Sequence, residues 1–308
     1  MGQMNSSEAQ IVDPILTTHA QGYKQADLVG HELFPAVPVD DFHGQVIEFG
    51  LESFHLYNSI RAAGSDTKEV QFGYEGKPYS LVQDAIEGKV PRERLKQAQR
   101  AAKLDMGKRT VRGVMRIMKL RLEYDQSQMA RDPNNYDADH KADFSAAKWT
   151  DDNNDPIADI KAAQEAIRRT TGVRGNKLVL SPVAFTAIQN NAKVMERFKY
   201  TKPSLVTLED IRAACELKKV VVGDAITADK DKQFSDVWGK DAVLAYVSEQ
   251  AADQDEPSYG YTYTMRGHPI AEPSYLNKGN KSYMYPVTYE RKPVLSGMLA
   301  GYLFRNVA

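Results

Sequence analysis

The sequence predicts an α+β fold in which a long helix precedes a compact α/β segment and tyrosine-rich strands follow it. Three observations carry this prediction. A proline-free segment from Leu95 to about Met129 has apolar residues at helical spacing. Residues 150–247 alternate helical patterns with short apolar strands. The C-terminal residues 257–308 hold eight of the 16 tyrosines, most of them in alternating patterns typical of strands.

Composition excludes several classes of protein. The 308 residues include 40 Lys and Arg against 41 Asp and Glu, a net charge of -1. This balance argues against a nucleic-acid binder that works through overall positive charge. A single cysteine, Cys215, excludes an intramolecular disulfide and fits a reducing compartment. No run of about 18 apolar residues occurs and the N-terminus is polar, so we expect a soluble chain without membrane span or secretory signal.

The first fifty residues do not resemble the start of a compact domain. Pro14, Pro35 and Pro38 interrupt scattered apolar residues, and each proline opposes helix continuation. The apolar segment 33–39 contains two of these prolines, so it cannot be an interior strand. Either an extended arm lying on another surface or an ordinary irregular lead-in explains this pattern.

Residues 44–82 have the pattern of a hairpin. Residues 46–50 and 68–74 are the predicted strands, and the turn-rich residues 61–67 are the predicted tip. A two-stranded hairpin is marginally stable alone, so we expect it to pack on something, such as a neighbouring chain.

The long helix begins near Pro91, which suits a first helical turn, and ends at Asp132 and Pro133. Gly107 and Gly113 predict a bend or a break within it. Thirteen basic residues against four acidic ones give residues 89–131 a charge of +9, whereas eight acidic residues against two basic ones give residues 132–160 a charge of -6. The basic residues form either a solvated face balanced by this acidic segment or a surface facing phosphate or an acidic partner.

The segment from 150 to 247 is the predicted α/β module. Asp155 and Pro156 open a helix, Pro182 opens another, and Thr207 with an acid three residues later resembles a capping box. Apolar runs at 177–181, 219–223 and 242–247 are the predicted strands. After it, Tyr259 to Met265 and Tyr283 to Tyr289 alternate as two strands, which we expect to pair antiparallel with half-buried tyrosine faces.

A search for catalytic and ligand motifs finds none. The glycines of residues 172–177 lack the spacing of a phosphate-binding loop, and Ser181 lacks the surroundings of a catalytic serine. Asp137, Asp139 and His140 could hold a cation, but a solvated acidic loop explains them better. Cys215 lies on an apolar helix face, as a buried structural thiol does. We therefore expect no catalytic residue, no metal site, no cofactor and a structural role.

The chain from Trp149 onward resembles the major capsid proteins of tailed bacteriophages, which share the Hong Kong 97-type fold. No single matching segment is specific to this family, but the order and spacing of the segments over about 75 residues are. The matching segments are residues 149–151 (WTD), 155–160 (DPIADI), 172–181 (GVRGNKLVLS), 194–200 (VMERFKY), 207–211 (TLEDI) and 220–223 (VVVG).

The resemblance implies a discontinuous architecture. Residues 1–45 would be an N-terminal arm and residues 46–88 an extended hairpin loop. Residues 89–150 and 251–308 would form a peripheral domain that contains the spine helix. Residues 151–250 would form an axial domain inserted into it.

The resemblance also implies a function: a structural subunit of an icosahedral phage head, assembled in the host cytoplasm, whose pentamers and hexamers enclose double-stranded DNA in the virion. Scaffolding, portal and decoration proteins would be further partners, and no membrane is involved. A basic inner face, for DNA or scaffold, would comprise Arg100, Lys103, Lys108, Arg109, Arg112, Arg116 and Lys119. Intersubunit anchors would be Leu33, Phe34, Val37, Phe49, Phe72 and Tyr74.

Three alternatives remain open from the sequence. An encapsulin-type cellular compartment would use the same fold around enzyme cargo. An α/β enzyme with dispersed site residues would form a small oligomer with an apolar pocket. A tail or portal component would form rings but no closed shell.

Overall fold

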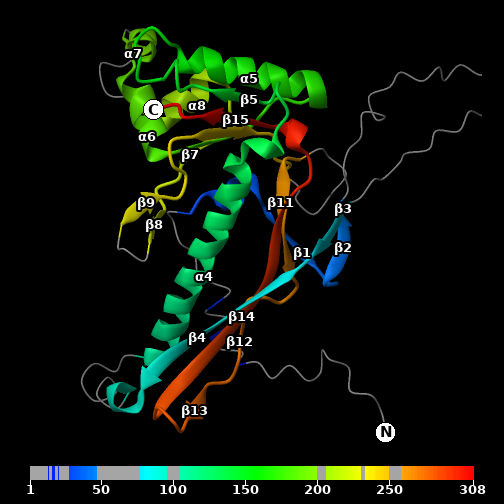
Figure 1. The fold of residues 1–308 in the computed structure, drawn as a ribbon, viewed down its shortest axis with the longest axis vertical. Helices are drawn as coiled ribbons and strands as arrows, with labels where there is room; N and C mark the ends of the chain where they lie inside the picture. The colour runs from blue at the N-terminus through cyan, green and yellow to red at the C-terminus, as the bar shows by residue number, and fades with distance from the viewer. Residues whose placement is uncertain are drawn as a thin grey trace, which may run out of the picture.

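The computed structural model of the chain describes residues 13, 16–17, 20, 28–46, 77–95, 105–199, 206–229, 233–249 and 258–308. The molecule is elongated. A five-stranded sheet with its helices lies at one end and a six-stranded sheet extends to the other, as Figure 1 shows. One long helix, α4 (Met106–Arg131), runs along the six-stranded sheet and ends beneath the five-stranded one.

The five-stranded sheet is apolar on both faces because each face is covered. Leu178, Leu180 and Leu244 point into a core with the helices, whereas Val179 and Val243 point into a second core on the other face. Successive side chains of a strand point to opposite faces of the sheet, which places the leucines in one core and the valines in the other. Its strands in order are β5 (Lys141–Asp143), β15 (Gly301–Arg305), β10 (Ala242–Ala245), β6 (Lys177–Leu180) and β7 (Lys219–Val222).

Local signals explain the helices of this module. Helix α5 (Pro156–Thr171) begins where the Asp155 carboxylate accepts hydrogen bonds from two backbone N–H groups, at 3.1 and 3.2 Å, and it ends at Gly172 with φ 73°. Thr207 and Asp210 form the complete capping box of α8. These predictions are confirmed. The module's other helices are α6 (Pro182–Asn190), α7 (Ala192–Phe198) and α8 (Leu208–Ala214).

The six-stranded sheet is built around β14 (Ser282–Leu295). Its residues 282–291 pair with β4 along one edge, and its other edge pairs in turn with β13, β12 and β11. The two tyrosine-rich strands therefore pair antiparallel, as predicted, but through residues 291–295 of β14. The remaining strands are β1 (Ala36–Val39), β4 (Val82–Pro91), β11 (Gly260–Met265), β12 (Ile270–Ala271) and β13 (Tyr275–Asn277).

The long helix is shorter than predicted and is not interrupted at its glycines. Asp105 is extended, and its carboxylate accepts a hydrogen bond from the Lys108 N–H at 3.1 Å, which starts α4 at Met106. Residues 92–95 are helical, and 96–104 lie outside the described residues. The helix runs unbroken through both glycines. A Cβ at Gly107 would lie 2.9 Å from the Tyr285 ring, so this glycine permits the helix to approach the sheet closely.

The described part of the predicted arm packs on its own chain. Helix α2 (Gly30–Leu33) is buried under the five-stranded sheet, and β1 pairs parallel with β11 as an edge strand. Leu33, Phe34 and Val37 are buried within the chain, so they do not offer apolar surface to a neighbour in this structure. The prediction that this segment is not an interior strand is confirmed.

Only the base of the predicted hairpin loop is described. Strands β2 (His43–Val46) and β3 (Lys77–Ser80) pair antiparallel there. The predicted strand 68–74, the tip, and all but the first residue of strand 46–50 lie outside the described residues, as do the anchors Phe49, Phe72 and Tyr74. A second, unpredicted hairpin consists of β8 (Ile226–Ala228) and β9 (Phe234–Asp236).

Strand pairing crosses the expected domain boundaries at 150 and 251. Strand β5 comes from the segment expected in the peripheral domain, and so does β15 at the C-terminus. Both pair in the five-stranded sheet, with β15 between β5 and β10. The C-terminal residues therefore belong to the core of the α/β module, where Phe304 is 5.4 Å from Trp149 between ring centroids.

Candidate interaction surfaces

One face of α4 is basic and exposed. Arg109, Arg112 and Arg116 lie at i, i+3 and i+7 and are exposed, while Val111, Val114 and Met115 on the opposite face are buried against the sheet. Among the described residues, no carboxylate lies within ion-pair distance of Arg109 or Arg112. A row of guanidinium groups on one helix face can bind phosphate or carboxylate groups.

The other predicted basic residues are less available. Lys108 is half-buried and forms an ion pair with Asp105 at 3.6 Å. Lys119 is half-buried and lines a cleft of about 730 Å³ between α2, α4 and β7. Arg100 and Lys103 lie outside the described residues.

The acidic segment after α4 makes its ion pairs within the α/β module. Asp143 lies 3.8 Å from Arg305, and Asp155 pairs with Arg197. Asp143 also accepts hydrogen bonds from Ser145 and Asn306, which hold its pKa at about 2. These pairs stabilise the loops around α5, so they are local to that module.

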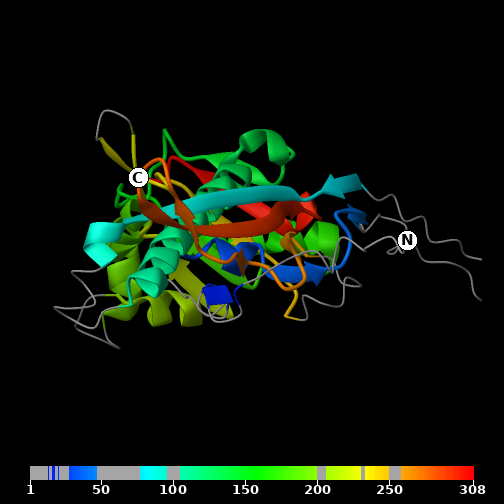
Figure 2. The ribbon, with the colours of Figure 1, turned by 90° about the horizontal axis from the view of Figure 1, so that it is seen from below.

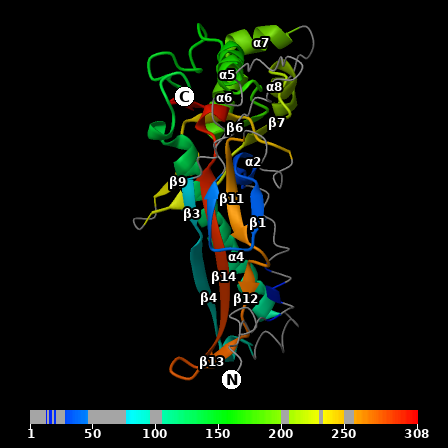
Figure 3. The ribbon, with the colours of Figure 1, turned by 90° about the vertical axis from the view of Figure 1, so that its right-hand side faces the viewer.

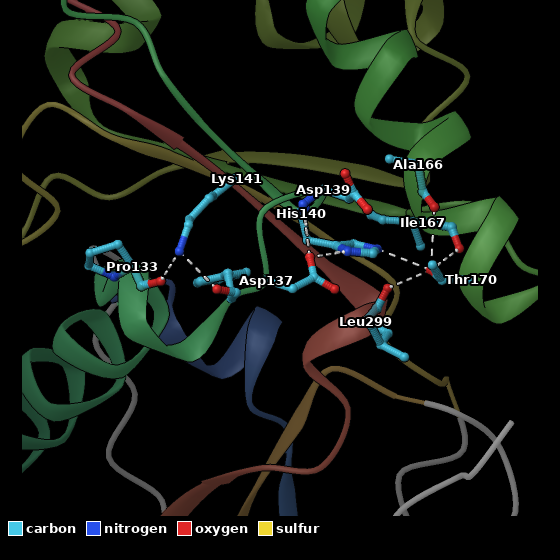
Figure 4. Close-up of polar contacts among 10 residues, drawn as sticks. Pro133, Asp137, Asp139, His140, Lys141, Ala166, Ile167, Thr170 and Leu299 are labelled. Carbon is cyan, nitrogen blue, oxygen red and sulfur yellow. Dashed lines mark hydrogen bonds and ion pairs between the residues drawn. The ribbon is translucent and has the colours of Figure 1, made fainter.

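His140 joins the acidic segment to α5 through hydrogen bonds (Figure 4). Its Nδ1 lies 2.7 Å from Asp137 and its Nε2 lies 3.0 Å from the hydroxyl of Thr170, and the ring is buried. Lys141 donates to the carbonyls of Pro133 and Tyr136 at 2.8 and 3.0 Å. Within the described parts of the chain, no three His, Cys, Asp or Glu side chains are grouped as metal ligands would be.

The remaining candidates for chemistry also have packing roles. Gly172 is the left-handed C-cap of α5, and Ser181 caps α6 by accepting from the Ala184 N–H at 3.2 Å. Cys215 is buried, and burial raises the pKa of its thiol to about 12. In the described segments, no helix has the length and apolar character that a membrane span requires.

A buried carboxylate, Glu123, joins three parts of the molecule. It accepts hydrogen bonds from the N–H groups of Val29 at 3.0 Å and Gly30 at 2.8 Å, and from the indole of Trp238 at 2.7 Å. A Cβ at Gly30 would lie 2.2 Å from the Gln126 side chain and 2.8 Å from the Glu123 carboxylate, so a larger residue here would displace the ends of both side chains. Helix α4 therefore holds both the arm and the loop that precedes β10.

A second carboxylate, Glu32, ties the arm to the α/β module. It lies 3.1 Å from Lys177 on β6 and 2.5 Å from Lys219 on β7, and His31 lies 3.1 Å away. Hydrogen bonds from His31, Lys219 and Lys177 hold the pKa of Glu32 well below its ordinary value, although burial opposes them. The charged form of Glu32 therefore stabilises the docked arm.

This depressed pKa predicts a pH-dependent effect of Glu32→Gln. The stabilisation by Glu32 is fully present above the unfolded-state pKa of about 4.3 and is lost as pH falls below it. We expect the variant to lose most free energy of unfolding at about pH 5, and to lose progressively less at lower pH. Denaturant unfolding of both chains from about pH 5 downward measures it. A loss that grows as the pH falls below about 5 would contradict the proposed charge on Glu32.

Comparison with solved structures identifies the class of protein. A phage-related protein of Bordetella bronchiseptica is similar over 97% of this chain and 98% of that one, with 44% identity and a TM-score of 0.84. A putative prophage capsid protein of Escherichia coli CFT073 shares the fold at 12% identity and a TM-score of 0.53, covering 96% of this chain and 99% of that one. An encapsulin of Synechococcus elongatus shares it at 13% identity and 0.56, covering 96% of each chain. The fold is the Hong Kong 97-type capsid fold.

The sequence relatives then identify the family. The major capsid protein of Burkholderia phage BcepMu is 32% identical over 100% of this chain and 99% of its own length. The major capsid protein of Pseudomonas phage JBD67 is 22% identical and covers 82% of each chain. No family model matches the chain. The chain belongs to the major capsid proteins of phages, which are located in the capsid of the virion.

Proposed function

We propose that the chain is the structural subunit of an icosahedral phage head, without catalysis, and that it assembles into pentamers and hexamers around double-stranded DNA. The full-length similarity to the BcepMu major capsid protein carries this proposal. The likeness to an encapsulin is one of fold alone. Scaffolding, portal and decoration proteins are proposed as further partners, and assembly is proposed to take place in the host cytoplasm.

We further propose how the architecture serves this role. The six-stranded sheet with α4 forms the peripheral part, and the five-stranded sheet with α5 to α8 forms the axial part. The predicted hairpin loop, whose base is formed by β2 and β3, contacts a neighbouring subunit. Many modest contacts of this kind stabilise a closed shell because each subunit binds several neighbours at once.

Expression of the full chain, alone and together with its neighbouring genes, tests the assembly. Sedimentation velocity and negative-stain imaging should show hollow shells, or rings of five or six subunits. A uniform species of one to four subunits in both preparations would refute the proposal.

The basic face of α4 is proposed to face the interior and to attract packaged DNA without sequence specificity. Exposed arginines do so by releasing counterions from the phosphate backbone, an attraction that weakens as salt rises. Arg109 and Arg112 support this assignment, because both are exposed and neither has a carboxylate within ion-pair distance among the described residues.

Charge reversal on this face distinguishes binding of DNA from binding of a protein partner. We expect Arg109→Glu with Arg112→Glu to leave empty shells intact and to reduce the yield of DNA-filled heads, because the repulsion acts on phosphate. The exposed pair Arg169→Glu with Arg174→Glu on the α/β module is the control. Failure of the α4 variant to form shells would instead indicate that these residues bind a neighbouring subunit or a scaffolding protein.

A further inference from the structure

The β8–β9 hairpin projects from the side of the molecule beside α4 (Figures 1 and 2). In its antiparallel register, Ile226 lies opposite Asp236, Thr227 opposite Ser235, and Ala228 opposite Phe234. Residues directly opposite each other share a face, and successive residues alternate. One face therefore carries Ile226, Ala228, Phe234 and Asp236, and the other carries the hydroxyl groups of Thr227 and Ser235, which are 3.1 Å apart.

The apolar face of this hairpin is open to solvent. Phe234 is 73% exposed and Ile226 is 49% exposed, although the residues at the base of the hairpin, Ala225 and Val237, are buried. Water solvates the polar face of the hairpin better than its apolar face. A two-stranded hairpin is marginal in water without a covered apolar face, and an exposed apolar patch marks an interaction site.

We infer that the apolar face of the β8–β9 hairpin docks on a second copy of this chain. The inference rests on the proposed shell function, because a shell subunit is surrounded laterally by copies of itself. The hairpin projects on the side opposite to the base β2–β3 (Figures 1 and 2). Projections on opposite sides suit head-to-tail contacts, which close into rings.

A second copy also offers a surface of matching chemistry. The cleft of about 730 Å³ beside α2 has the apolar residues Leu28, Val29 and Val221 in its lining, together with His31 and Lys219. An aromatic side chain fits such a cleft, whose apolar residues lie beside the ion pair of Glu32 and Lys219. In Figure 3, β9 lies at one edge of the molecule and α2 lies between it and the opposite edge.

Site-specific photo-crosslinking in assembled shells tests the contact. p-Benzoyl-phenylalanine in place of Phe234 should give a covalent dimer of the chain on irradiation, and the crosslinked peptide locates the acceptor. The same group in place of Ser235, on the polar face, is the control and should give little dimer. Crosslinking to a different protein, or no dimer from position 234, would overturn the inference.

A substitution tests this inference independently of the proposed function. Phe234→Ser should keep the thermal midpoint of the unassembled chain, because the side chain is exposed, and should lower the yield of shells about tenfold or more. Ser235→Ala on the opposite face should assemble as the wild type does. Wild-type yield from Phe234→Ser would overturn the inference, whereas a wild-type chain that forms no shells would refute the proposed function itself.

Discussion

Replacing Glu123 with alanine is expected to lower the free energy of unfolding by about 3–5 kcal/mol. The substitution leaves three buried donors without an acceptor, the N–H groups of Val29 and Gly30 and the indole of Trp238. Each unsatisfied buried donor costs about 1–3 kcal/mol. Urea unfolding of the unassembled chain measures the loss, and limited proteolysis near Val29 should show that the arm has detached from α4.

Two further variants serve as comparisons for this prediction. Glu123→Gln keeps the size of the side chain, but its amide NH₂ group must face a donor, so we expect an intermediate loss. Glu196→Ala removes an exposed carboxylate on α7 and should change stability by less than about 0.5 kcal/mol. A loss below about 1 kcal/mol for Glu123→Ala would show that the arm is not held by this carboxylate.

The second large effect is expected at the end of α4. Arg131 donates to Asp241 at 2.7 Å and to the carbonyl of Val237 at 2.9 Å, and Asp241 is buried. Asp241 also accepts from the N–H of Asn306 at 2.9 Å, close to the C-terminus. Arg131→Ala leaves a buried carboxylate without its cation, which costs about 3–5 kcal/mol.

The same helix supplies the control for this prediction. Arg121 pairs with Asp125 at 3.1 Å, one turn apart and largely exposed to water. Exposed pairs of this kind contribute about 0.3–0.5 kcal/mol, so Arg121→Ala should have a small effect. In denaturant unfolding, the double variant Arg131→Ala with Asp241→Asn should lose less than the sum of the single variants. Equal losses for Arg131→Ala and Arg121→Ala would contradict the role of the buried pair.

Both effects concern how α4 holds the rest of the molecule. Glu123 attaches the arm and the Trp238 loop to the middle of the helix, and Arg131 attaches the same loop to its end. The sequence contained no signal for these contacts, because Glu123 and Val29 are separated by 94 residues.

The sequence by itself determined the features that depend on near neighbours along the chain. The caps of α5 and α8, the apolar strands 177–180, 219–222 and 242–245, and the buried thiol of Cys215 are all present as predicted. These signals are local, since a cap joins residues two or three positions apart and an apolar run requires burial whatever covers it. Several of these segments, from Asp155 to Gly223, also carried the resemblance to the capsid family.

Only the tertiary structure decided what each apolar segment packs against. The sequence pattern of Leu33, Phe34 and Val37 is compatible with two outcomes. One is that these residues anchor a neighbouring subunit, and the other is the observed burial on the chain's own strands. Likewise, no local signal placed β15 between β5 and β10, or left Phe234 uncovered on a short hairpin. The hydrophobic effect depends on the area removed from water and not on the partner that removes it. The choice between an intrachain core and an assembly surface is therefore made by packing between residues distant in the chain.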